Sequence, residues 1–200
     1  MFQLAEEHLS KSDRIMAKLI EVYKPCVLKP QKDYFEVLCN SIISQLISTK
    51  AALTIFNRFC ALYNNSISPL SILNTPVEQL MTIGLSRAKA TSIKDLAEKY
   101  QTSLKDQDFQ QLSDEEIISL LISVRGIGRW TAEIFLIFSL NRLDVLPVAD
   151  LGLKRAVTIH YQLQDLTTPK QLLEIGENWR PYRSIASWYL WRSLNNKPTE

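Results

Sequence analysis

The chain has few of the residues that build metal sites or disulfide frameworks. Its 200 residues include three cysteines and two histidines, His8 and His160. The cysteines stand in apolar or helical surroundings without CxxC spacing; they are Cys26, Cys39 and Cys60. The sequence therefore indicates neither a zinc site nor a disulfide framework.

The sequence also lacks long apolar runs and a strong charge of either sign. No run reaches the ~18 uninterrupted apolar residues of a membrane-spanning helix, and the stretch MFQLAEEHLSKSDRIM has early acidic residues and no apolar core of signal length. We therefore expect an intracellular protein without membrane contact, in the cytoplasm or nucleoid, or in the nucleus of a eukaryote. The net charge of +2 does not by itself indicate nucleic-acid binding.

Strand-like alternation between turn signals is scarce too. A hydrophobic content of 46% with 22% charged residues is ordinary for a folded soluble protein. Apolar residues recur at helical spacing over 13–24 and again from residue 34 onward. In the second pattern the recurring residues are Phe35, Leu38, Ile42 and Leu46. These patterns predict an all-α fold with about ten short helices.

Short polar motifs predict where several helices begin. Ser48 or Thr49, and later Ser86, precede helical patterns and can cap them. Capping boxes are expected at Thr75-Pro76-Val77-Glu78, Ser113-Asp114-Glu115-Glu116 and Thr168-Pro169-Lys170-Gln171. The polar stretch 64–75 is predicted to be a loop.

The most informative stretch is a pair of apolar runs, 117–124 and 134–140, on either side of Gly126-Ile127-Gly128. This pattern predicts two helices joined by a very short turn. Glycines permit a positive φ and let a ligand approach the backbone closely. The first N–H groups of the second helix suit an anion such as phosphate. Arg125 and Arg129 flank the turn. A tight turn without any ligand is the alternative interpretation.

The segment resembles the helix-hairpin-helix of the DNA glycosylase superfamily that includes endonuclease III. GIGRWTA and the later WRPYRSIASWYLW are similar to the 3-methyladenine DNA glycosylase II branch, and the resemblance spans roughly residues 35–192. It implies two helical lobes, 33–142 with the hairpin and 1–32 together with 143–200. The second lobe would carry the catalytic aspartate and the aromatic pocket residues. Because no cysteine follows Cys60, the iron–sulfur cluster of some members is not expected.

Asp150 stands where this superfamily keeps its catalytic aspartate. It precedes a helical segment, 151–160, so a helix N-cap is the structural alternative. The two roles are compatible, because a helix N-terminus favours an anion and an anion stabilises the positive charge that grows on the sugar when an N-glycosidic bond breaks.

Trp130 occupies the position where strand-cutting members have a lysine that forms a Schiff base. The resemblance therefore implies a monofunctional glycosylase that hydrolyses alkylated purines, such as 3-methyladenine and 7-methylguanine, from double-stranded DNA. Trp130 and Trp191 match pocket positions that stack on the flipped base, while Trp188 is more typical of core packing. Ile134 departs from the aromatic residue of some relatives, which puts the substrate range in doubt.

Leu46, in SIISQLIS, corresponds to the apolar wedge that the family inserts into the minor groove, and Gln45 beside it could contact the DNA. A core position is the alternative for Leu46. Arg183 could contact phosphate or form a structural ion pair. Ile83-Gly84-Leu85-Ser86 is interpreted as a structural turn, and Lys89 matches a lysine of the family pattern. The residues expected to bind DNA are Gln45, Leu46, Arg125, Gly126, Ile127, Gly128, Arg129, Trp130 and Thr131.

By resemblance, the main-chain carbonyls of Ile122, Val124 and Ile127 could hold Na⁺ or K⁺; no other cofactor is expected. The expected partner is double-stranded DNA with damaged bases, bound by a monomer. Two alternatives remain at this point. A non-catalytic DNA-binding module would not need Asp150, Trp130 and Leu46 together, and a glycosylase with lyase activity would need a lysine at position 130.

Overall fold

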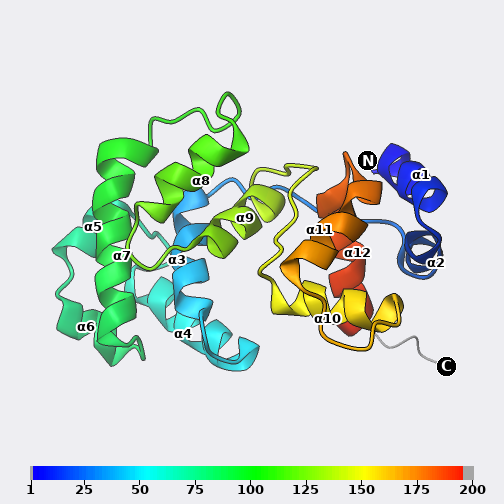
Figure 1. Ribbon diagram of the computed structural model, residues 1–200. Coiled ribbons are helices and arrows are strands. Elements are labelled where there is room, and N and C mark those ends of the chain that lie inside the picture. Colours follow the sequence, from blue (N-terminus) through cyan, green and yellow to red (C-terminus); the bar gives the residue numbers. More distant parts are fainter. Residues whose placement is uncertain (1, 196–200) are drawn as a thin grey trace. The chain divides into compact units, whose positions relative to one another are not determined.

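The computed structural model describes residues 2–195. Within this range it contains twelve α-helices and no strand, so the predicted all-α fold is confirmed. The chain divides into two compact units, residues 31–135 and residues 1–30 with 136–200 (Figure 1). The boundary after residue 135 falls inside helix α9 (Arg129–Phe138), whereas the sequence predicted a boundary after residue 142.

The unit of residues 31–135 is built around one long helix, α7 (Arg87–Lys99), which packs against α3, α5 and α6 (Figure 1). Its inward positions Ala90, Ile93 and Leu96 are fully buried. The other helices of this unit are α3 (Tyr34–Ser44), α4 (Thr49–Leu62), α5 (Pro69–Asn74), α6 (Val77–Thr82), α8 (Asp114–Ile122) and the first part of α9 (Arg129–Phe138), with a π-helical turn at Tyr100–Leu104.

The second unit centres on α12 (Arg183–Asn195), which packs against α1, α2 and α10 (Figure 1). A half-buried carboxylate helps to join its parts, because Asp13 caps α2 and also accepts hydrogen bonds from the side chains of Tyr161 and Trp179. Its remaining helices are α1 (Gln3–Ser12), α2 (Arg14–Tyr23), α10 (Leu151–His160) and α11 (Pro169–Gly176), followed by a 3-10 turn at Glu177–Trp179.

Most of the predicted helix starts are confirmed by their caps. The hydroxyl groups of Ser48 and Ser86 accept main-chain N–H groups of α4 and α7. Ser113 with Glu116 and Thr168 with Gln171 form complete capping boxes at α8 and α11. These caps were readable because the donor and acceptor lie within three residues of each other.

The predicted loop 64–75 is wrong in part, because α5 occupies Pro69–Asn74. Ser68 caps this helix in a box with Ser71, and Pro69 stands at its first position. A helix of six residues is too short to show an apolar period in the sequence. Short helices of this kind also explain why about ten helices were predicted, whereas residues 2–195 contain twelve.

The predicted cap at Thr75 is also wrong. Helix α6 begins at Val77 without a side-chain cap. The Thr75 hydroxyl donates to the carbonyl of Ser71 at 2.8 Å and accepts from the Tyr63 hydroxyl at 3.0 Å. Thr75 therefore serves the end of α5 rather than the start of α6.

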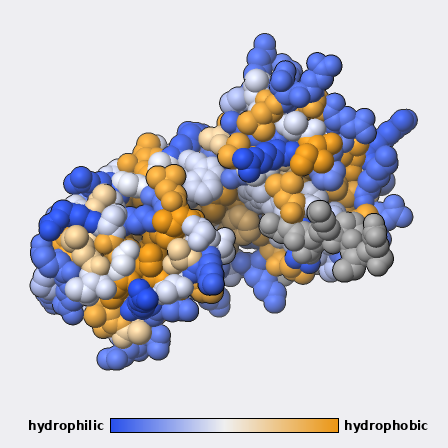
Figure 2. Space-filling view, turned by 90° about the horizontal axis from the view of Figure 1, so that it is seen from below, coloured by the Kyte–Doolittle hydropathy of each residue, from blue (hydrophilic) through white to orange (hydrophobic). Residues whose placement is uncertain are grey.

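The surface of the molecule mixes apolar and polar side chains. Figure 2 shows apolar groups among hydrophilic ones on the visible face. Singly exposed apolar residues are ordinary on soluble proteins. Among the described residues no helix is long and apolar enough to span a membrane.

Candidate functional site

The hairpin turn, residues 123–128 between α8 and α9, needs its first glycine for internal reasons. Gly126 has φ +82°, and a Cβ built on it would lie 2.6 Å from the Ser92 hydroxyl of α7. A Cβ on Gly128 would meet nothing within 4 Å. Gly126 therefore lets the turn pack on α7, whereas Gly128 keeps the outer side of the turn open.

The main-chain N–H groups of the hairpin turn differ in whether they have a hydrogen-bond partner. Arg125 N–H donates to the Asp95 carboxylate at 2.6 Å, and Ile127 N–H donates to the Val124 carbonyl at 3.1 Å. In the described part of the chain, no hydrogen bond uses the N–H of Gly126, Gly128 or Arg129. Two of these three groups stand at the start of α9, where the helix dipole favours an anion.

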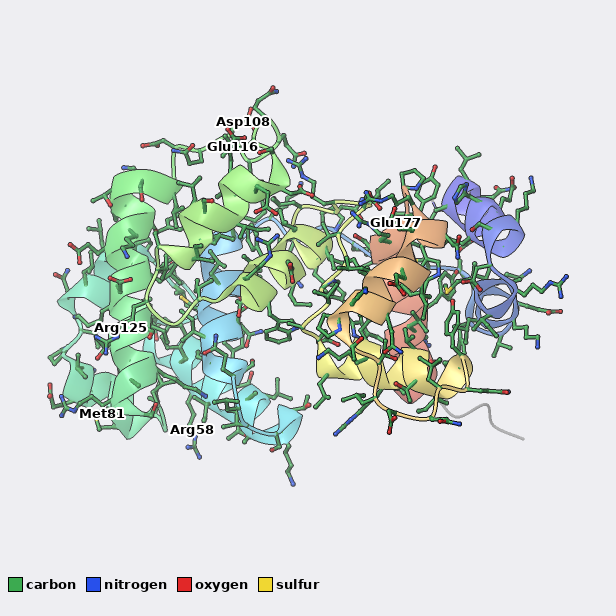
Figure 3. All side chains as sticks on the ribbon, viewed as in Figure 1. Arg58, Met81, Asp108, Glu116, Arg125 and Glu177 are labelled. Atoms are coloured by element: carbon green, nitrogen blue, oxygen red, sulfur yellow. The ribbon has the colours of Figure 1, made fainter. Side chains whose placement is uncertain are left out.

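The two flanking arginines differ in their surroundings. Arg125 is exposed and lies beside α7 (Figure 3). Arg129 forms ion pairs with Glu115 of α8 and with Glu133, the latter at 3.0 Å. Burial raises the pKa of Glu133, and Arg129 opposes that shift. Part of the Arg129 charge is therefore neutralised within its own unit.

Ile127 and Thr131 have buried side chains, each only 4% exposed. If these two predicted DNA-binding residues touch DNA, only their main chain can do so. The Val124 carbonyl, one of three expected cation ligands, accepts the Ile127 N–H and keeps a second lone pair that could ligate an ion. Among residues 2–195, no cluster of three His, Cys, Asp or Glu side chains could hold a metal ion.

Leu46 is fully exposed, at 103% of its reference area, so the alternative of a core position is wrong. Helix α3 ends at Ser44, two residues before it. The backbone of Leu46 has φ +56°, in the left-handed region that branched bulky side chains rarely adopt. An unusual backbone that holds an apolar side chain in solvent is the kind of local strain found at functional sites.

Polar contacts hold the Leu46 loop, residues 45–48, in place. The Lys89 ammonium donates to the carbonyls of Ile43 at 2.8 Å and Gln45 at 2.7 Å. The Gln45 side-chain amide donates to the Gly126 carbonyl at 2.9 Å. Gln45, predicted to contact DNA, thus ties the Leu46 loop to the hairpin turn.

Asp150 caps α10, as the structural alternative predicted. Its Oδ1 accepts the Leu153 N–H at 2.6 Å and the Trp191 indole N–H at 2.8 Å. A Cβ on Gly152 would lie 3.1 Å from the same oxygen and 3.5 Å from the Trp191 ring, so this glycine permits their close approach. The carboxylate is held in a fixed orientation by one main-chain and one indole donor.

The indole that donates to Asp150 packs against a second aromatic ring of the same unit. The Trp191 ring lies 5.6 Å from that of Phe138, with 30° between their planes. Phe138 was missed from the sequence, although it follows Ile134 and Trp130 at four-residue spacing along α9. Trp130 is 41% exposed, whereas Trp188 packs edge-on against Tyr189 at 5.0 Å.

Arg183 belongs to the framework of its unit. Its guanidinium is 13% exposed and binds both the carboxylate of Asp144, at 2.7 Å, and the Asp144 carbonyl, at 2.6 Å. Arg180 pairs with the same carboxylate at 2.8 Å. The interpretation of Arg183 as an ion-pair partner is therefore confirmed.

The family model of the HhH-GPD superfamily of base excision DNA repair proteins matches residues 39–181. DNA-3-methyladenine glycosylase 1 of Schizosaccharomyces pombe is 37% identical over 196 residues, covering 94% of this chain and 86% of that protein. The solved structure of S. pombe 3-methyladenine DNA glycosylase with abasic DNA has a TM-score of 0.87 at 35% identity, covering 97% of this chain and 98% of that one.

A DNA-3-methyladenine glycosidase from Bacillus halodurans has a TM-score of 0.82 at 31% identity, covering 94% and 88% of the two chains. The resemblance inferred from GIGRWTA and WRPYRSIASWYLW is thereby confirmed. The chain belongs to the helix-hairpin-helix superfamily of base excision DNA repair proteins.

Proposed function

We propose that this protein is a monofunctional DNA glycosylase that removes alkylated purines such as 3-methyladenine and 7-methylguanine from double-stranded DNA, acting as a monomer. The observation that carries the proposal is the Asp150 carboxylate, held at the start of α10 by Leu153 and Trp191 within a family of base excision enzymes. Relatives named DNA-3-methyladenine glycosylases support the substrate class.

In the proposed reaction Asp150 stabilises the positive charge that develops on the sugar. The bond between the sugar C1′ and the purine nitrogen breaks, and its electron pair leaves with the base. A cationic alkylated base then departs as a neutral molecule, so no separate acid is needed to protonate it. A water oxygen bonds to C1′ and releases a proton, which leaves an abasic site.

Trp130 supports a reaction without a covalent intermediate. Its indole has no nucleophilic amine and cannot form an imine with the sugar. The indole faces of Trp130 and Trp191 suit a cationic purine, since cation–π attraction of roughly 1–2 kcal/mol favours an alkylated base over a neutral one. Phe138, in contact with Trp191, makes the surroundings of Asp150 more aromatic than Ile134 alone suggested.

The hairpin turn would bind a DNA phosphate through main-chain N–H groups, with Arg125 nearby. Such contacts carry no base information, so they set affinity for any duplex. A monovalent cation held by the carbonyls of Ile122, Val124 and Ile127 would add positive charge at the same place. Leu46 would enter the space that the flipped base leaves, because nothing in its own unit covers it.

The proposal is tested by incubating the protein with methylated genomic DNA and separating the released bases by chromatography. We expect free 3-methyladenine and 7-methylguanine, and no DNA adduct after borohydride treatment. Absence of any released base would contradict the glycosylase assignment. A trapped adduct would show that some amine makes the enzyme a lyase.

A further inference from the structure

Helix α7 carries four polar residues at spacings of three, three and four: Lys89, Ser92, Asp95 and Lys99. Such spacing places them along one side of a helix. Each of them contacts either the Leu46 loop with the end of α3, or the hairpin turn. One helix face therefore supports both elements that are proposed to meet DNA.

Three of the four support the hairpin turn. Asp95 accepts the Arg125 N–H at 2.6 Å, and Lys99 donates to the Ser123 carbonyl while pairing with Asp95 at 3.2 Å. Ser92 lies so close to Gly126 that no side chain fits there. The hairpin turn is thus fixed to α7 from Ser123 to Gly126, by polar contacts and by close packing.

Lys89 supports the other element. The last carbonyls of a helix have no partner inside it, and the helix dipole makes that end negative. The Lys89 ammonium supplies two donors there, to the Ile43 and Gln45 carbonyls on either side of Ser44. The next residue along the chain is Leu46, with its unusual φ of +56°.

The two hydrogen bonds to these carbonyls are part-buried, so they replace water around the Lys89 ammonium, and the same burial lowers the pKa of Lys89. Without the ammonium, both carbonyls would need water molecules as hydrogen-bond donors. The backbone at Leu46 would then be free to relax toward an ordinary negative φ, and its side chain would change direction.

We propose that Lys89 is the positioning residue for the Leu46 wedge, and that α7 sets the distance between this wedge and the phosphate-binding turn. The inference rests on the proposed wedge function of Leu46. Gln45 completes the link, because its main-chain carbonyl accepts from Lys89 and its side chain donates to the Gly126 carbonyl. Lys89 acts through Leu46 and need not touch the substrate.

The chain supplies a matched control for this role. Lys94, also on α7, donates to the carbonyls of Leu73 at 2.8 Å and Thr75 at 2.7 Å, at the end of α5. Lys94→Met and Lys89→Met remove the same chemistry from the same helix. Only Lys89→Met removes it next to Leu46, so general loss of stability affects both variants and wedge misplacement affects one.

Single-turnover excision is measured on a damaged base in a fully paired duplex and in a mismatched duplex. We expect Lys89→Met to lower the rate on the paired duplex by about tenfold and the rate on the mismatched duplex much less, because a mismatch reduces the stacking that the wedge must replace. Affinity for undamaged duplex should stay within about twofold, since the hairpin turn is intact. Lys89→Arg, which keeps the charge and donors, should recover most of the activity.

The double variant with Leu46→Ala shows whether Lys89 acts through the wedge. Once Leu46 is removed, Lys89→Met should reduce paired-duplex excision by less than about twofold further. Additive losses, or equal losses in Lys89→Met and Lys94→Met, would overturn the inference. If Leu46→Ala impairs the paired duplex selectively but Lys89→Met does not, only the role of Lys89 fails. If Leu46→Ala shows no selectivity, the wedge function fails and the inference fails with it.

Discussion

The hairpin turn and the Asp150 cluster (Asp150, Trp191 and Phe138) are proposed to recognise DNA with different kinds of groups. In residues 31–135 the groups proposed to bind are main-chain N–H groups, and Lys89, Asp95 and Lys99 of α7 hold the neighbouring main chain through hydrogen bonds. In residues 136–200 a side chain, Asp150, is held by an indole and by a helix start. Main-chain groups suit a repeating phosphate backbone, whereas a carboxylate among aromatic rings suits one chemical step on one nucleotide.

The difference predicts that changes at the hairpin turn weaken the affinity for every duplex, while changes at the Asp150 cluster lower excision without weakening the binding of DNA.

The largest effect on binding is expected from Gly128→Asp. The new carboxylate would stand where the phosphate must come, so affinity for undamaged duplex at low salt should fall at least about tenfold. The slope of log affinity against log salt concentration should become shallower by about one phosphate contact. Gly128→Ala should fold normally, because its Cβ meets nothing within 4 Å. Binding is measured by fluorescence anisotropy across salt concentrations. Unchanged binding by Gly128→Asp would show that the hairpin turn does not bind phosphate.

A matched change at the other glycine should act on stability instead. In Gly126→Ala the Cβ would meet the Ser92 hydroxyl at 2.6 Å at a residue with φ +82°. We expect a loss of roughly 1–3 kcal/mol in the free energy of unfolding, measured with urea. A variant as stable as the parent would mean that α7 does not constrain the turn.

Trp191→Phe should lower excision by about tenfold, since it removes the 2.8 Å hydrogen bond that orients Asp150 but keeps an aromatic ring near Phe138. Binding to undamaged duplex should not change. Single-turnover excision and anisotropy on the same duplex separate the two effects. A fall in binding without a fall in excision would reverse the division between the two regions.

The smallest effect concerns pH. Burial lowers the pKa of His160, which shares a 2.7 Å hydrogen bond with Ser193. The unfolded chain therefore binds this proton more readily than the folded one, so stability should fall as the pH drops below about 6.5. We expect a decrease of a few degrees at most in the midpoint of thermal unfolding, and a smaller one in His160→Gln. An equal pH dependence in both proteins would exclude His160 as the cause.

Local features were the most predictable from the sequence. The caps at Ser86, Ser113 and Thr168 join atoms within three residues, so short motifs reveal them. Asp150 was readable as a cap for the same reason. Helix α5 escaped because six residues show no period, and Thr75 was misassigned because its hydroxyl serves the preceding helix.

Contacts between distant residues were not predictable. Lys89 reaches carbonyls more than 40 residues away, and the Gln45 amide meets Gly126 across 81 residues. The helical period of 34–46 runs on through Leu46 and gives no sign that the helix stops at Ser44. Only the family resemblance pointed to an exposed Leu46, and the polar contacts that hold it there are visible only in the folded chain.

The central claim, that Asp150 performs chemistry rather than only capping α10, is tested most directly by Asp150→Asn in a single-turnover assay on 7-methylguanine in duplex DNA. Asn remains a competent N-cap, so thermal stability should change little. We predict that excision falls by two orders of magnitude or more, since removal of a preorganised transition-state contact typically costs ~3 kcal/mol, while binding to DNA with an abasic analogue is kept or tightened. Full excision by a stable Asn variant would contradict the account.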